Sequence, residues 1–282
     1  MLNFLFLTFL TAVVVLSHTV IEGAPVLILV YSSLFLCQAV LILVHGRGKF
    51  FRLFYDIIFP TISILVVFDS LGRIVHSINP RDIDPLLIRL DYLLFHGYPT
   101  VMMEKVMHPL LTDILQLSYA SYYFMPVALG VMLKMRGDDG AFDRSLFLIM
   151  LCFYLSYVGY MLWPAIGPRF TLNHLQGTDI RGLLVAGPIQ ELLNRLEGVK
   201  RDAFPSGHTG IALTVLYLAH RFERGLYRVL LPAVGALIFA TVYCRYHYVV
   251  DVIGGVALAA ITILAGEACY GYREKRLGTD RR

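Results

Sequence analysis

Long apolar runs recur along the whole chain and predict a membrane protein built of helices. A transmembrane helix needs roughly 20 predominantly apolar residues, and several runs approach or exceed this length. The runs cover residues 3–21, 25–45, 55–76, 109–133, 145–163, 206–221, 227–244 and 247–270. We therefore expect an all-α fold, a polytopic membrane helix bundle with about eight spans.

The first run and one of the connections each have a second interpretation. The run at 3–21 could be a signal peptide, but it has no Lys or Arg before its apolar residues and no clear A-x-A cleavage site. Residues 82–107 alternate charged with apolar positions. That spacing is typical of an amphipathic helix lying at the membrane surface, and a plain connecting loop is the alternative.

Composition excludes several classes of protein. The chain has 282 residues, of which 57% are hydrophobic and 16% charged, and its mean hydropathy is +0.68. Ordinary soluble domains are about 45–50% apolar and about 25% charged. A disordered chain, a nucleic-acid-binding domain and an ordinary soluble enzyme are therefore excluded, and we expect no nucleic-acid partner.

The placement of basic residues predicts the orientation in the membrane. Eight spans put both termini on one side, together with the loops 46–54, 134–144 and 222–226. These segments, their flanks and the tail hold 14 of the 24 Lys and Arg residues. Short basic loops face the cytoplasm, so this side is expected to be cytoplasmic. Seven or nine spans remain alternatives.

Three short segments carry residues suited to chemistry, and all three fall on the opposite, outer or lumenal side. They are 163–169 (WPAIGPR), 200–209 (KRDAFPSGHT) and 244–251 (CRYHYVVD).

The second segment has the features of an anion site at a helix start. The proline before Ser206 suits the first turn of a helix, where its missing N–H costs nothing. Ser206, Gly207 and His208 would follow at the N-terminus, where free N–H groups and the helix dipole attract an anion. Lys200 and Arg201 add positive charge nearby. A Pro-Ser helix start without a ligand is the alternative, and the histidine with two cations upstream favours the anion site.

The third segment pairs a histidine with an aspartate. His247 and Asp251 are four residues apart, which places them on one face of a helix. A carboxylate that binds one ring nitrogen leaves the other free to attack. An interfacial pair that only anchors the helix is the alternative. Arg245 lies two residues before the histidine and could equally be a membrane-edge cation.

Together these residues predict phosphoryl chemistry at one membrane face. One histidine can attack phosphorus while the other protonates the leaving oxygen, and arginines bind phosphate. No carboxylate cluster for Mg²⁺ accompanies them, so we expect neither metal nor cofactor. A Walker-type glycine loop is also missing, which argues against nucleotide hydrolysis.

Residues 204–209 and 247–251 resemble the second and third motifs of the type-2 phosphatidic acid phosphatase superfamily. The resemblance covers about 55–270 and implies a six-helix phosphatase or phosphotransferase core there. Two additional transmembrane helices would occupy 1–54, and a basic cytoplasmic tail would follow at 271–282.

The resemblance also implies a role for each motif residue. His247 would be the nucleophile that forms a phosphohistidine, Asp251 would orient it, and His208 would be the general acid. The phosphate would be held by Ser206, Gly207 and Arg169.

Two positions depart from the family pattern. Leu162 stands where the first motif has a lysine, and Thr241 stands where the third motif has an arginine. The pattern Arg-Tyr-His-Tyr-x-x-Asp is similar to that of the inositol phosphorylceramide synthase-like branch. Lys200 or Arg245 would then replace the missing lysine at the phosphate.

Three functions follow as hypotheses. The first is a membrane phosphatase that acts on a lipid phosphate through a phosphohistidine, without metal. The second is a phosphotransferase that moves a phosphoryl headgroup from a phospholipid to an alcohol by the same chemistry. The third is a channel or transporter, because charges within membranes also mark ion pathways.

Overall fold

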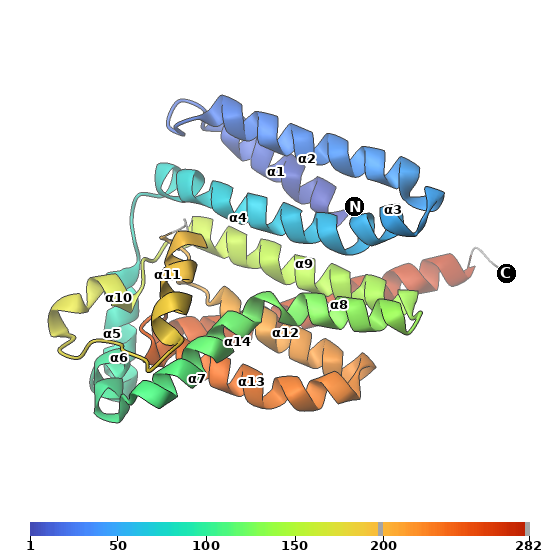
Figure 1. The fold of residues 1–282 in the computed structure, drawn as a ribbon. Coiled ribbons are helices and arrows are strands. Elements are labelled where there is room, and N and C mark those ends of the chain that lie inside the picture. The colour runs from blue at the N-terminus through green and yellow to red at the C-terminus, as the bar shows by residue number, and fades with distance from the viewer. Residues whose placement is uncertain (197–199, 280–282) are drawn as a thin grey trace.

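The fold is helical throughout the part of the chain that the computed structural model describes, residues 1–196 and 200–279, with the side chains of 193–196 and 273–279 excepted (Figure 1). The helices that coincide with the apolar runs are α1 (Leu2–Leu16), α2 (Ala24–Val44), α4 (Phe59–Ile78), α7 (Pro109–Ala120), α8 (Met125–Met135), α9 (Asp139–Leu162), α12 (Gly207–Phe222), α13 (Arg224–Tyr243) and α14 (Val249–Thr279). The other elements are η1 (His45–Arg47), α3 (Lys49–Leu53), η2 (Phe54–Ile58), α5 (Asp84–Phe95), α6 (Pro99–Met102), η3 (Met103–Val106), η4 (Ser121–Tyr123), α10 (Pro168–Thr171), η5 (Asn173–Leu175) and α11 (Ala186–Leu196).

Each predicted span coincides with a helix or a pair of helices. Five helices in the described residues are long and apolar enough to cross a membrane: Ala24–Arg47, Lys49–Ile78, Asp139–Leu162, Arg224–Tyr243 and Val249–Tyr272. The run 109–133 is a sixth candidate, bent by 52° between α7 and α8. The polytopic helical fold is thus confirmed. Because α1 and α12 are shorter, at 15 and 16 residues, the count of eight stays a prediction.

The N-terminal helices pack onto the rest of the bundle. In Figure 1, α1 and α2 form an outer layer over α4, and α4 lies against α9. A buried polar cluster joins the layers, because the Asn3 amide donates to Gln38 at 2.8 Å and the Ser63 hydroxyl donates to Asn3 at 3.1 Å. Tyr154 of α9 also donates to Asn3. Such hydrogen bonds across apolar helices fix their register.

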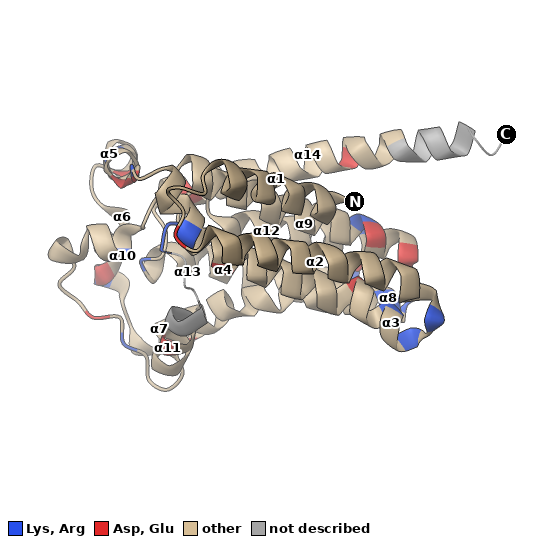
Figure 2. Ribbon diagram, turned by 90° about the horizontal axis from the view of Figure 1, so that it is seen from above, with Lys and Arg blue, Asp and Glu red and all other residues tan. Residues whose placement is uncertain are grey.

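The two ends of the bundle differ in architecture. The N-terminus and the far end of α14 lie at one end, whereas α5, α6, α10 and α11 gather at the other (Figure 1). Charged ribbon is concentrated at both ends, and the helices between them are almost free of charge (Figure 2). The body between the ends therefore has the composition that a bilayer core requires.

The segment 82–107 contains the helix α5 and, after it, the short elements α6 and η3. The polarity of α5 is opposite to that of a simple surface helix. Asp84 and Asp91 point inward and are only 3% and 2% exposed, whereas Leu93 and Leu94 are more than half exposed. Buried carboxylates need hydrogen-bond partners. The reason for this arrangement is the set of backbone N–H groups beneath α5, described below.

Candidate active site

The starts of α12 and α14 lie against each other, which brings the second and third motif segments together. A Cβ atom at Gly255 would lie 2.5 Å from the carbonyl oxygen of Ser206, so only glycine allows this approach. The Ser206 N–H donates to the carbonyl of Asp251 at 3.0 Å. The first turn of each helix is thereby fixed to the other.

Ser206 is the N-cap of α12 and is fully buried. Its Oγ accepts from the N–H of Thr209 at 3.3 Å, so the helix begins at Gly207 and the preceding proline lies outside it. A Cβ at Gly207 would meet the hydroxyl of Tyr160 on α9 at 2.2 Å. Both residues thus lie at the helix start, as expected, and their contact with a phosphate stays a prediction.

The backbone turn after α13 fixes the position of the third motif segment. Its backbone forms a Schellman motif, in which Arg245 N–H donates to Val242 at 3.0 Å and Tyr246 N–H donates to Thr241 at 2.9 Å. Arg245 has φ 65°, a left-handed conformation that glycine usually supplies at this place. The His247 N–H also reaches Thr241, at 2.9 Å. The histidine therefore follows a tightly closed helix end.

His247 is held in one tautomer and is 3% exposed. Its Nδ1 lies 2.8 Å from the backbone carbonyl of Ala203, which can only accept, so Nδ1 carries the proton. Asp251 Oδ2 is farther from Nδ1, at 3.5 Å. Nε2 is left with its lone pair, and it lies 3.4 Å from Nδ1 of His208. The geometry therefore assigns Nε2 as the atom able to attack.

His208 lies in an aromatic cage. The ring of Tyr119 stacks on it at 4.4 Å between centroids, and Tyr122 lies at the same distance. Its Nδ1 lies 3.4 Å from both His247 Nε2 and the hydroxyl of Tyr119, whereas its Nε2 is buried and has no hydrogen-bond partner. With His247 Nε2 as acceptor, His208 Nδ1 is the donor. The proton on His208 thus points at the nucleophile, where a leaving oxygen would arrive.

Asp251 lies at the third position of α14 and closes its first turn. Its Oδ2 accepts from the N–H of Tyr248, the N-cap residue, at 2.8 Å. The same oxygen approaches His247, which lies just before the helix rather than on it. The pair thus meets across a helix start and not along one face, as the spacing had suggested. Its orienting role stays a prediction, shared with the carbonyl of Ala203.

Arg245 is turned toward a carboxylate. Its guanidinium donates to Glu104 Oε1 and to the carbonyl of Thr178, both at 2.7 Å. It is 6% exposed. The arginine therefore ties two surface segments to the third motif, and its expected phosphate contact would have to coexist with Glu104.

The remaining predicted phosphate ligands are spread around the site. Arg201 forms a two-pronged ion pair with Asp82, at 2.7 and 3.1 Å. Lys200 is exposed. Arg169 lies on α10, half-buried, with its guanidinium 5.8 Å from the ring centre of Phe170. The structure thus brings His247, His208 and Asp251 together, while phosphate binding by these cations stays a prediction.

Four acidic residues that sequence reasoning missed hold the motif segments in place. All come from the segment 82–107, and each binds a different part of the site: Asp82, Asp84, Asp91 and Glu104. Their signal was present in the sequence, because carboxylates recur among leucines at helical spacing. That spacing predicts an amphipathic helix at the membrane surface. In the structure its carboxylates instead face the motif segments, where two of them bind backbone N–H groups and two bind arginines.

Asp84 and Asp91 show how this works. Asp84 accepts from the N–H groups of Ile166 and Gly167 in the first motif, both at 2.9 Å. Asp91 accepts from the first N–H groups of α14, at 3.1 and 2.9 Å, and so caps that helix. Burial raises the pKa of Asp91, and the two N–H donors oppose this by stabilising the charged form.

Asp202 was also missed as a site residue. It precedes Ala203 and lines the same cavity as His208 and Tyr160. Burial raises the pKa of Asp202 to about 6, and the nearby His247 opposes the rise. A third titratable group therefore lies beside the two histidines.

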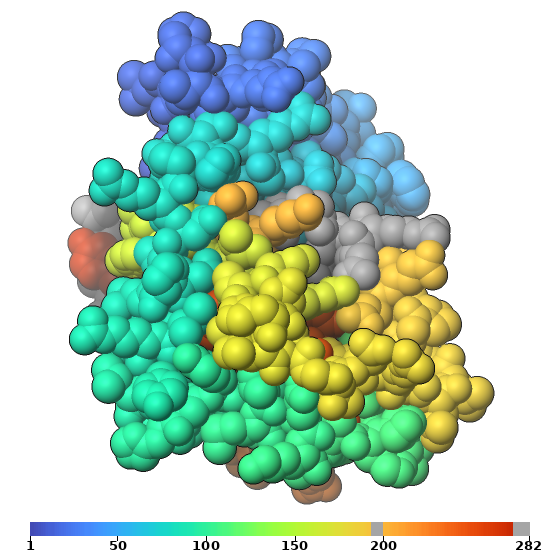
Figure 3. Space-filling model, turned by 90° about the vertical axis from the view of Figure 1, so that its left-hand side faces the viewer, coloured from blue at the N-terminus to red at the C-terminus, as the bar shows by residue number. Residues whose placement is uncertain are grey.

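The end of the molecule that carries the site is hollowed. Figure 3 views this end and shows a depression beside the yellow loop that includes α10, with atoms from late in the chain, coloured dark orange to red, at its base. The first motif segment packs directly against the third, since a Cβ at Gly167 would lie 2.8 Å from the carbonyl of Tyr246.

Comparisons with known proteins agree with this arrangement. Residues 86–265, which contain all three motif segments, match the model of the PAP2 superfamily. The chain is also 26% identical over 177 residues to a PA-phosphatase related-family protein of Dictyostelium discoideum. The matched stretch is 55% of this chain but only 32% of that relative, and no solved structure matches the chain. Because the family match takes in more than half of the chain, together with the two histidines and the aspartate that meet in the site, the chain belongs to the PAP2 superfamily.

Proposed function

We propose that this protein is an integral membrane phosphatase that hydrolyses a lipid phosphate through a phosphohistidine on His247, without a metal. Membership in the PAP2 superfamily supports phosphate ester chemistry on lipids. The observation that carries the mechanism is the pairing of His247 Nε2 with His208 Nδ1 at 3.4 Å, while Ala203 holds the proton on the other nitrogen of His247.

The first step transfers the phosphoryl group to the enzyme. His247 Nε2 forms a bond to phosphorus, the P–O ester bond breaks, and the leaving oxygen takes the proton from His208 Nδ1. In-line transfer needs ~3 Å on each side of the phosphoryl group, so the two nitrogens must separate to about twice their present distance. His208 also lines a cavity, so its ring is not enclosed on every side.

The second step releases the phosphate. His208, now without that proton, accepts one from water as the water oxygen attacks phosphorus and the N–P bond breaks. An alcohol in place of the water would give a phosphotransferase by the same steps. The similarity to the inositol phosphorylceramide synthase-like branch makes this the alternative, and the channel hypothesis is not needed to account for the paired histidines.

We further propose that the site opens to the outer or lumenal side and that both termini face the cytoplasm. The basic short loops lie at the end of the bundle opposite the motif segments, which supports this orientation.

Trapping the intermediate tests the proposed function. Purified protein in EDTA, mixed with ³²P-labelled phosphatidic acid and quenched within a turnover, should carry an acid-labile, base-stable label on His247 and release inorganic phosphate. A label that appears without phosphate release, and that an added alcohol discharges, would identify a phosphotransferase. Turnover that requires Mg²⁺ would contradict the metal-free mechanism.

The pKa of Asp202 predicts a specific pH dependence. Below about pH 6 this carboxyl is neutral, and above it the carboxylate repels the substrate phosphate. The ratio of kcat/KM for Asp202→Asn to that of the wild type should therefore rise from near one at pH 5 to roughly tenfold at pH 8. Asp139→Asn, at the opposite end of the bundle, should keep a constant ratio. A constant ratio for Asp202→Asn would show that this carboxyl does not face the phosphate.

A further inference from the structure

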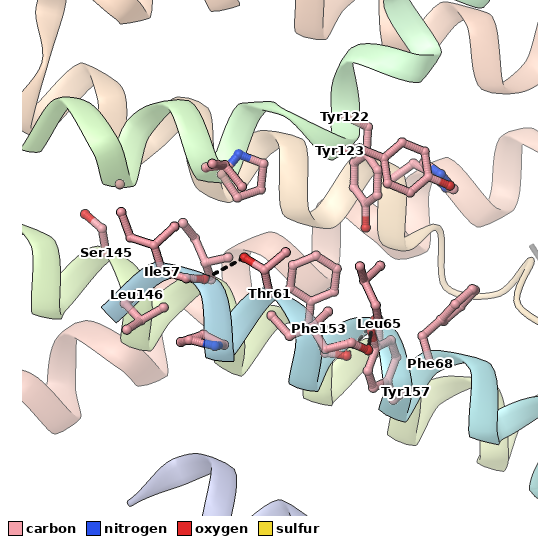
Figure 4. A pocket seen from close by; sticks show the side chains of 18 of the residues that line it. Ile57, Thr61, Leu65, Phe68, Tyr122, Tyr123, Ser145, Leu146, Phe153 and Tyr157 are labelled. Atoms are coloured by element: carbon pink, nitrogen blue, oxygen red, sulfur yellow. Dashed lines mark hydrogen bonds between the residues drawn. The ribbon is translucent and has the colours of Figure 1, made fainter. Parts of the chain in front are cut away.

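An apolar slot runs through the bundle between α4, α8 and α9 and ends at the active site. Figure 4 shows it from close by, with Ile57 and Ser145 toward one end, Thr61 and Phe153 along its length and Tyr157 toward the other. Most of the lining is aliphatic and aromatic. The slot thus presents a hydrocarbon surface inside the protein.

The length of the slot suits one long chain. Its lining on α9 extends from Phe142 to Tyr160, a distance of ~27 Å at 1.5 Å per residue. The hydrocarbon core of a bilayer is ~30 Å thick, so the slot runs along most of it. The cavity volume is only about 130 Å³. Cavities of ~150 Å³ hold a ligand the size of benzene, so a long chain must widen the slot as it binds.

The two ends of the slot differ in chemistry. One end is lined by His208 and Asp202, so it is continuous with the proposed phosphate chemistry. The other end stops at Asp56, whose carboxylate is bound by Lys134 at 2.7 Å. A ligand with a polar head and a long apolar tail therefore fits in one direction, with its head at the histidines.

One wall of the slot lies outside the residues that match the family. The wall on η2 and α4, from Asp56 to Phe68, precedes the matched residues 86–265. Leu65 lines the slot and is 50% exposed, so the slot opens sideways along α4. A chain can thus enter from the bilayer without passing through water.

We propose that this slot binds one hydrocarbon chain of the lipid phosphate along α4 while the phosphate is at His208, and that any second chain stays in the bilayer. The proposal rests on the proposed function, because the head of the ligand is taken to be the phosphate ester that His247 attacks. Through η2 and α4, residues 56–68 then determine how long a chain the enzyme prefers.

A matched pair of substitutions on α4 tests this inference. Thr61 lines the slot, whereas its neighbour Ile62 does not line it and is 43% exposed on the lipid side. Thr61→Trp should raise KM for hexadecyl phosphate by roughly tenfold, because the indole occupies the space of the chain. It should leave kcat/KM for para-nitrophenyl phosphate, which has no chain, within about twofold. Ile62→Trp should change neither value.

A substitution in a second wall of the slot and a crosslinking experiment test the same binding independently. Val127→Trp fills the slot from α8 and should repeat the effect if Thr61→Trp does not fold. A hexadecyl phosphate with a diazirine at its chain end should crosslink to residues 57–68, which reports binding even without turnover. The proposal would be wrong if Thr61→Trp and Val127→Trp affected hexadecyl phosphate and para-nitrophenyl phosphate equally. It would also be wrong if the crosslinks missed residues 57–68. Crosslinking there without turnover of either substrate would instead overturn the proposed function.

Discussion

Replacing His247 by glutamine is expected to lower kcat/KM for a lipid phosphate by at least about 10³-fold, since the side chain that would form the covalent intermediate is lost. Glutamine keeps a donor that can reach the carbonyl of Ala203, which now binds Nδ1 at 2.8 Å. The protein should therefore remain folded. Phosphate release and ³²P labelling, both measured in EDTA, should disappear together.

A control on α12 separates chemistry from folding. His220 lies near the opposite end of this helix, where its ring packs edge-on against Tyr227. His220→Gln should retain wild-type turnover within about twofold, because surface changes away from the site have small effects. If His247→Gln still released phosphate at a rate near that of His220→Gln, another group would be the nucleophile.

Much of the fold could be predicted because apolar runs of membrane length leave few alternatives. The helical bundle is confirmed, and each run coincides with helix. The pattern could not show that the run 109–133 bends by 52°, because the apolar run continues through both halves. Pro126, in the first turn of α8, was the local signal of that break.

The sequence predicted the parts of the site that side chains form, but not the contacts that the backbone makes. His247, His208 and Asp251 were selected by residue type and spacing, and they meet in the structure. The carbonyl of Ala203, which fixes the tautomer, has no signature in sequence. The sequence also does not show which distant residues pair, so the ion pair between Arg245 and Glu104 could not be predicted.

The largest effect away from the histidines is expected at Asp84. Its buried carboxylate accepts from Ile166 N–H, Gly167 N–H and the hydroxyl of Tyr248, each at 2.9 Å. Asp84→Ala leaves the N–H groups of Ile166 and Gly167 without an acceptor, and each unsatisfied group costs about 1–3 kcal/mol. The hydroxyl of Tyr248 keeps its hydrogen bond with Thr171. Since neighbouring losses are not additive, we expect the free energy of unfolding to fall by about 4 kcal/mol.

Asp84→Ala should also lower kcat, because Tyr248 follows His247 directly and Gly167 packs on the turn that precedes His247. A displacement of about 1 Å at a reacting group can cost 10²-fold in rate, so kcat should fall by about that factor in protein that is still folded. Asp82→Ala is the matched control two residues earlier, where a partly exposed ion pair with Arg201 is worth about 1 kcal/mol or less. Thermal unfolding in detergent and initial rates at low temperature measure both effects. Equal behaviour of the two variants would mean that the first motif keeps its place without Asp84, and that α5 only covers the site instead of building it.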